Sequence, residues 1–338
     1  MPTLLFGAGA GWAPPVRPPS GSGRVVTTPG GSASPRRGRG EAVAPAAAVV
    51  QSCPAIKGYQ ALPGGRTMLV TAPPTKHLRA AVIMLHGYTA TPAGEEAVSG
   101  WTDLMAGTNA LVAYPEGIPT PYGGYGWSTG AARFATTGSN DVADIDNAIA
   151  KLAHDDCVDP RQVMVAGESN GSGLGLVLGC NRHTASLVRL FALAIPAVDK
   201  RVLAHCQGAS SFPLLVIASL HDQTVTYGGR YPAGVAPFMA PLAWFEEVGT
   251  KVNRCRGLEK AHVPDGEHYW YKRCAAPSNF FVADDGHHTW PGGPQGAGGL
   301  APGRFPATEV AWCASGLSAT PAPFNCATIR PLYGLQRP

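Results

Sequence analysis

The chain has 338 residues, of which 45% are hydrophobic and 14% are charged, and it contains 43 glycines and 32 prolines. This composition is typical of a globular protein with a large buried core and many turns. The net charge of +4 comes from residues 1–50, which hold five arginines and one glutamate. The remaining 21 basic (26 − 5) and 21 acidic (22 − 1) side chains balance, so we expect no nucleic-acid partner.

Residues 1–50 are rich in Pro, Gly, Ser, Ala and Arg and have no hydrophobic period. We expect them to form a disordered leader or linker, with room for a targeting segment although no clean signal peptide is visible. The folded domain is predicted over residues 51–316, and residues 317–338 are predicted to form an irregular, proline-rich tail. Because no run of 18 apolar residues occurs, we expect no transmembrane helix.

Within the folded domain, short apolar runs alternate with segments of helical periodicity. Predicted strands cover Ala80–Leu85, Leu111–Tyr114, Gln162–Ala166, Phe191–Ile195, Leu214–Ala218 and Phe280–Val282. Predicted helices cover a segment capped by Ser139 or Asn140 and reaching Leu152, then Ser172–Cys180, Pro241–Val252 and Glu309–Cys313. This alternation predicts an α/β fold with a doubly wound, mostly parallel sheet and helices on both faces.

The segment Val163–Gly171 leads a buried strand directly into the pattern G-x-S-x-G. Between a strand and a helix, this pattern is typical of the nucleophile elbow of an α/β-hydrolase. Ser169 would occupy a strained turn, and Gly167 and Gly171 would leave room for the neighbouring backbone. In a chain with 43 glycines, a chance occurrence is the alternative, and the flanking strand and helix argue against it.

A serine needs a base and an acid, which in this fold follow it in the order Ser, Asp or Glu, His. Asp222 follows the predicted strand Leu214–Ala218, and the pair His287 and His288 follows the last predicted strand. Position alone leaves either histidine as the general base for Ser169, with Asp222 orienting the ring. We expect no cofactor.

The oxyanion of a tetrahedral intermediate needs two backbone N–H donors. We expect these from Asn170, directly after the nucleophile, and from Tyr88 in the turn that begins with His86 and Gly87. An ordinary turn with a buried, hydrogen-bonded His86 is the alternative.

Eight cysteines are dispersed through the chain without a C-x-x-C pair, and no histidine lies at zinc-ligand spacing beside them, so we expect no metal. Their even number favours disulfides and secretion, with buried free thiols as the alternative. Of 105 complete pairings, Cys255–Cys274 is favoured because the segment between them can return as a hairpin. The other predicted pairs are Cys313–Cys326, Cys180–Cys206 and, by elimination, Cys53–Cys157, for which lipidation of Cys53 is the alternative.

The chain resembles the secreted feruloyl esterase and polyhydroxybutyrate-depolymerase-like family over about residues 53–315. The matching motifs are His86-Gly87, Tyr114-Pro-Glu-Gly117, Cys157-Val-Asp-Pro160, Gly167-Glu-Ser-Asn-Gly171, Asp222 through Tyr227-Gly-Gly229, and His288-Thr-Trp-Pro-Gly-Gly293. The resemblance selects His288 as the general base. Glu168 departs from the family pattern, in which an apolar residue or lysine is common.

The resemblance implies a secreted, monomeric serine esterase that acts on hydroxycinnamoyl esters of plant polysaccharide. A polyhydroxybutyrate depolymerase, an acetylxylan-type esterase, a serine peptidase and a non-catalytic binding protein are the alternatives. Trp290, Tyr125 and Trp127, together with Tyr88, are predicted to form an aromatic wall for the substrate, with core packing as the alternative.

Overall fold

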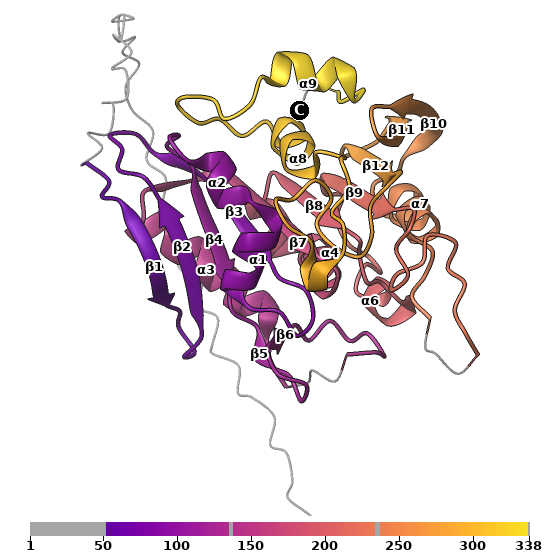
Figure 1. Ribbon diagram of the computed structural model, residues 1–338, viewed down its shortest axis with the longest axis horizontal. Helices are drawn as coiled ribbons and strands as arrows, with labels where there is room; N and C mark the ends of the chain where they lie inside the picture. Colours follow the sequence, from indigo (N-terminus) through magenta and orange to yellow (C-terminus); the bar gives the residue numbers. More distant parts are fainter. Residues whose placement is uncertain (1–51, 135–137, 234–236, 337–338) are drawn as a thin grey trace, which may run out of the picture. The chain divides into compact units, whose positions relative to one another are not determined.

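The computed structural model describes residues 52–134, 138–233 and 237–336. The chain divides into two units, Met1–Ala48 and Val49–Pro338. The first unit holds most of the predicted leader and lies outside the described residues. All helices and strands reported below belong to the second unit (Figure 1).

A ten-stranded sheet runs through the second unit in the order β1-β2-β4-β3-β7-β8-β9-β12-β11-β10. Its strands are β1 (Ile56–Ala61), β2 (Thr67–Ala72), β3 (Arg79–Leu85), β4 (Leu111–Pro115), β7 (Val158–Glu168), β8 (Leu190–Ala194), β9 (Leu214–Ser219), β10 (Arg256–Val263), β11 (Gly266–Arg273) and β12 (Ser278–Ala283). The six central strands from β4 to β12 are parallel, and the pairs at both edges are antiparallel. This mixed, mostly parallel sheet, with its antiparallel second strand, has the topology of an α/β-hydrolase. A separate two-stranded hairpin joins β5 (Ile118–Pro119) to β6 (Tyr125–Gly126).

Helices cover both faces of the sheet. They are α1 (Pro92–Ser99), α2 (Trp101–Met105), α3 (Asp141–Asp155), α4 (Asn170–Cys180), α5 (Arg182–Leu187), α6 (Lys200–Ala204), α7 (Pro241–Lys251), α8 (Ala307–Ser315) and α9 (Cys326–Leu332), with a short 3₁₀ turn η1 (Ala297–Gly299). The N-cap of α3 is Asn140, whose side chain accepts a hydrogen bond from Ala143 N at 3.2 Å.

Two hydrophobic cores follow from the alternation of side chains along each strand. In β3, Ala81, Ile83 and Leu85 face the core that includes α3, α4 and α7, whereas Ala80, Val82 and Met84 face the core that includes α2 and α8. Figure 1 shows α4 and α8 over opposite faces. Strands buried on both faces need continuous apolar sequence, which explains why the predicted parallel strands are all present.

The four disulfides of the structure are the four predicted pairs, Cys53–Cys157, Cys180–Cys206, Cys255–Cys274 and Cys313–Cys326. The predicted hairpin between Cys255 and Cys274 is β10 and β11.

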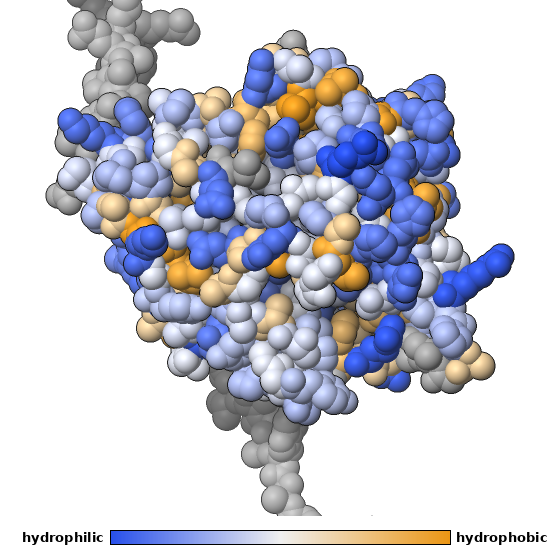
Figure 2. Space-filling view, viewed as in Figure 1, coloured by the Kyte–Doolittle hydropathy of each residue, from blue (hydrophilic) through white to orange (hydrophobic). Residues whose placement is uncertain are grey.

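The C-terminal tail differs from the irregular segment that the sequence predicts. It contains α9, and the ring of Tyr333 packs 5.6 Å from Phe305 and 6.4 Å from Phe281. Burial of these rings orders a segment whose proline content alone favours loops. Hydrophobic side chains remain visible on the surface over α9 (Figure 2). Leu332, the last residue of α9, is exposed.

Candidate active site

The elbow between β7 and α4 has the geometry that its sequence predicts. Ser169 has φ 52° and ψ −111°, a conformation that is rare for a residue with a side chain. A Cβ at Gly171 would lie 2.1 Å from the carbonyl oxygen of Leu85, so only glycine fits between the helix and β3. Ser169 N donates to Ala194 O at 3.1 Å, which ties the elbow to β8.

Ser169, His288 and Asp222 meet at the carboxyl edge of the sheet, because each follows a parallel strand, β7, β12 or β9. His288 Nε2 lies 2.9 Å from Ser169 Oγ, and His288 Nδ1 lies 2.7 Å from Asp222 Oδ2. Asp222 is 4% exposed. Its other oxygen accepts hydrogen bonds from the backbone N–H groups of Thr224 and Val225 at 2.7 and 2.8 Å, which fix the carboxylate.

The adjacent histidines occupy different environments. His288 contacts Ser169 and Asp222, whereas the ring of His287 lies 6.1 Å from that of His221. Between the two residues that the sequence leaves open, the geometry favours His288 as the partner of the serine.

The predicted oxyanion donors lie beside the serine. Asn170 is the first residue of α4, where backbone N–H groups have no partner within the helix. Its side chain accepts from Trp127 N at 2.7 Å and donates to Trp127 O at 3.2 Å, which fixes the loop. The turn that carries Tyr88 runs against the elbow, because a Cβ on Gly87 would lie 3.7 Å from Ser169 Cβ.

The side chain of His86 is buried and hydrogen-bonded, although its turn also carries the predicted donor Tyr88. It is fully buried, Nδ1 lies 2.8 Å from Gly87 O, and Nε2 accepts from Gly117 N at 3.1 Å. Burial lowers its pKa to about 4, so the ring is neutral and structural at physiological pH.

The predicted aromatic wall is wrong for both tryptophans. Trp290 and Trp127 are 0% exposed, and their Nε1 atoms donate to Thr308 Oγ1 and to His86 O. Both indoles complete their packing in the two cores and cannot touch a substrate. Tyr125 is partly exposed, and the nearby Glu116 raises the pKa of its phenol.

Other aromatic side chains lie near the predicted oxyanion turn. The ring of Tyr88 lies 4.7 Å from Phe134 and 6.5 Å from Tyr122, which is 78% exposed. The glycine-rich sequence from Tyr122 to Trp127 indicates an aromatic loop, but it does not reveal which rings point outward.

The sequence analysis did not identify the acidic environment of the site. Glu168, inside the elbow motif, and Glu95, on α1, are both buried. Burial raises the pKa of Glu168 to about 7, and burial together with the charge of Glu168 raises that of Glu95. The available signal was Glu168 itself, a charged residue where the resembling family usually has an apolar residue or lysine.

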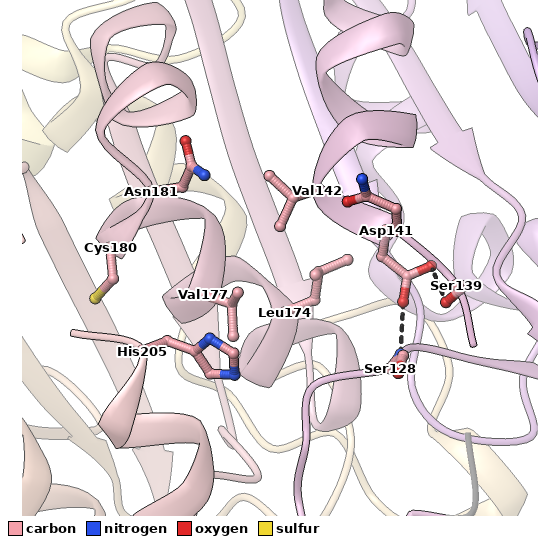
Figure 3. A pocket seen from close by; sticks show the side chains of 10 residues that line it. Ser128, Ser139, Asp141, Val142, Leu174, Val177, Cys180, Asn181 and His205 are labelled. Carbon is pink, nitrogen blue, oxygen red and sulfur yellow. Dashed lines mark hydrogen bonds between the residues drawn. The ribbon is translucent and has the colours of Figure 1, made fainter. Parts of the chain in front are cut away.

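A cavity of about 310 Å³ lies between α3 and α4 (Figure 3), and Ser169, His288 and Asp222 are not among the residues that line it. Its carboxylate, Asp141, is already engaged by Arg66 at 2.6 Å and by Ser139 Oγ at 3.0 Å. The carboxylate of this cavity is therefore already paired, and we assign the cavity no ligand.

Comparison with known proteins places the chain near esterases, although no family model matches it. It is 28% identical over 205 residues to feruloyl esterase B of Piromyces equi, covering 58% of this chain and 37% of that protein. It is 27% identical over 165 residues to a probable feruloyl esterase C of Aspergillus clavatus, covering 47% and 54%. The chain thus covers less than two thirds of the length of these curated relatives.

Comparison with solved structures matches the chain to an acetyl xylan esterase from Aspergillus awamori, with a TM-score of 0.48 and 16% identity over 71% of this chain and 94% of that one. An S-formylglutathione hydrolase from Agrobacterium tumefaciens has a TM-score of 0.47 and 13% identity, covering 71% and 91%.

Proposed function

We propose that this chain, an α/β-hydrolase related in sequence to feruloyl esterases, is a serine carboxylic-ester hydrolase with Ser169 as nucleophile, His288 as general base and Asp222 as the acid that orients the ring. The observation that carries the proposal is the continuous path from Ser169 Oγ through His288 to Asp222, with distances of 2.9 and 2.7 Å.

The proposed reaction begins when Ser169 Oγ attacks the ester carbonyl carbon while His288 Nε2 takes the hydroxyl proton. The carbonyl oxygen becomes an oxyanion between the backbone N–H groups of Tyr88 and Asn170, each worth about 3 kcal/mol of transition-state stabilisation. Collapse breaks the ester C–O bond, and His288 returns the proton to the leaving alcohol. Water then hydrolyses the acyl-serine by the same sequence.

The proposed substrate is a hydroxycinnamoyl ester on a plant polysaccharide. Two observations support it: the sequence relation to feruloyl esterases, and the rings of Tyr88, Tyr122 and Phe134 beside the proposed oxyanion turn. Stacked or edge-on aromatic contacts suit a planar acyl group better than a flexible hydroxybutyrate chain.

The substrate proposal is tested by measuring kcat/KM for methyl ferulate, a short hydroxybutyrate oligomer and acetylated xylan side by side. We expect methyl ferulate to be preferred, and Tyr122→Ala to raise KM for methyl ferulate while leaving p-nitrophenyl acetate hydrolysis unchanged. A preference for the oligomer, or an equal effect of Tyr122→Ala on both esters, would contradict the assignment.

We further propose an extracellular location. Its support is the set of four disulfides, which form and persist in oxidising compartments. Among the described residues, no helix is both long enough and apolar enough to cross a bilayer.

A further inference from the structure

Two carboxyl groups are buried together next to the site proposed above. Glu95 on α1 is 2% exposed, and Glu168 at the end of β7 is 5% exposed. Each has one side-chain oxygen, Oε1 of Glu95 and Oε2 of Glu168, that is buried without a hydrogen-bond partner in the described structure. Burial disfavours the ionised form of both carboxyls, and the charge of Glu168 further disfavours ionisation of Glu95.

Each carboxyl also faces the backbone of a different loop of the site. The N–H of Gly87, in the turn that carries Tyr88, interacts with Glu95. The N–H of Trp290, two residues after His288, interacts with Glu168. A Cβ on Gly87 would lie only 3.8 Å from Glu168 Oε1, so the Gly87 turn also lies against Glu168. The pair thus lies between the turn of the proposed oxyanion donor and the loop of the proposed base.

The surrounding charges distinguish the two members. The groups that act on Glu168 are His288, which favours its ionised form, and Asp222, which opposes it. Glu95 faces Glu168 and lies near the phenol of Tyr114, and neither of these neighbours supplies a positive charge. His288 favours the ionised form of Glu168, whereas no positively charged group among the described residues acts on Glu95. We therefore infer that Glu168 ionises first and that Glu95 keeps its proton.

We propose that Glu95 and Glu168 are a pair of positioning residues: Glu95 is a neutral carboxylic acid that holds the Gly87 turn, and Glu168 is the charged member that holds the His288 loop and stabilises the protonated His288 ring. The proposal rests on the function proposed above, because it assigns roles around Ser169. Asp222 remains the direct partner of the ring, and Glu168 acts beside it.

The roles are separable because glutamine imitates a neutral carboxylic acid but not a carboxylate. Glu95→Gln should therefore label with a fluorophosphonate within about threefold of the wild-type rate near neutral pH, since it replaces a group that the proposal holds to be neutral there. Glu168→Gln removes the charge near His288. We expect its labelling rate to fall about tenfold at pH 8 and the acid limb of its pH profile to move down by about half a pH unit to one unit.

Glu96→Gln is the matched control, because it makes the same change on the same helix at a partly exposed carboxyl that contacts Thr71. Glu96→Gln should leave both the rate of fluorophosphonate labelling and its pH profile unchanged. Similar behaviour of Glu95→Gln and Glu168→Gln would overturn the proposal, since a merely structural pair predicts no such asymmetry.

An NMR titration of the glutamate side-chain carboxyl carbons supplies a readout that does not require turnover. In the wild-type protein one carboxyl signal should titrate near pH 7, when Glu168 ionises, and this signal should be absent in Glu168→Gln. The lack of any such carboxyl signal in the wild-type protein would contradict the proposal even if the variant does not fold. If the wild-type protein is not labelled at all, the proposed function fails, whereas the titration still decides the role of the pair.

Discussion

The buried carboxyl of Glu168 should make the stability of the protein depend on pH in a defined direction. Its pKa is about 7 in the folded protein against an ordinary value of 4.5, and the side chain is 5% exposed. Because the folded state binds this proton more tightly than the unfolded state, the stabilising effect of the proton is greatest below pH 4.5 and is lost as pH rises towards 7. Well above pH 7 the carboxyl is ionised in both the folded and the unfolded state, so its contribution to the free energy of unfolding no longer changes with pH.

Glu168→Gln removes this titration. A pKa rise from 4.5 to about 7 corresponds to about 3 kcal/mol in total, most of which falls between pH 5 and pH 8. The free energy of unfolding of Glu168→Gln, minus that of the wild-type protein, should therefore become more positive by about 2 to 3 kcal/mol over this range. Any cost of burying the amide is the same at both pH values, so it cancels in this comparison.

The assay is urea unfolding followed by tryptophan fluorescence at pH 5 and pH 8, with disulfides intact and Glu96→Gln as the control. For Glu96→Gln, the difference in unfolding free energy from the wild-type protein should change by less than about 0.5 kcal/mol between pH 5 and pH 8, because this carboxyl is partly exposed. If the difference in unfolding free energy between Glu168→Gln and the wild-type protein stays constant with pH, or decreases toward pH 8, then Glu168 does not have the raised pKa in the folded protein.

Two other expectations follow from the contacts. His288→Ala should lower kcat for p-nitrophenyl acetate by about three orders of magnitude or more, because His288 contacts Ser169 and Asp222. His287→Ala, which changes the neighbouring histidine, should keep kcat within about threefold of the wild-type value. A larger loss of kcat in His287→Ala than in His288→Ala would contradict this placement of the two histidines. Replacing Cys53 and Cys157 with serine opens a loop of 104 residues and should cost about 4 to 5 kcal/mol of unfolding free energy, and a loss below 1 kcal/mol in chemical denaturation would argue against that bridge.

The parallel strands could be predicted from sequence because a strand covered on both faces needs an uninterrupted apolar run. Ala80–Leu85 and Leu214–Ala218 are such runs, and they match β3 and β9 within one residue. The edge strand β1 and its neighbour β2 were not predicted. β1 alternates between partly buried and exposed residues, so its sequence is not distinctive outside the context of its partner.

The positions of Ser169, Asp222 and His288 were predictable because loops that follow parallel strands meet at one edge of the sheet. The roles of Trp127 and Trp290 were not, because an indole in a core and an indole in a pocket have the same sequence signature. Their full burial and their hydrogen bonds to His86 and Thr308 emerge only from the packing. The proximity of Glu95 and Glu168 could likewise not be predicted from the sequence, since these residues are 73 positions apart and lie on α1 and β7.

Whether Ser169 is an activated nucleophile is tested most directly by the mass of the intact protein after exposure to a fluorophosphonate. We expect one phosphonyl group per chain, located on the peptide that contains Ser169. No adduct should form in Ser169→Ala, whose kcat for p-nitrophenyl acetate should fall by about six orders of magnitude. Labelling of a different serine, or normal turnover by a folded Ser169→Ala protein, would show that Ser169 is not the nucleophile.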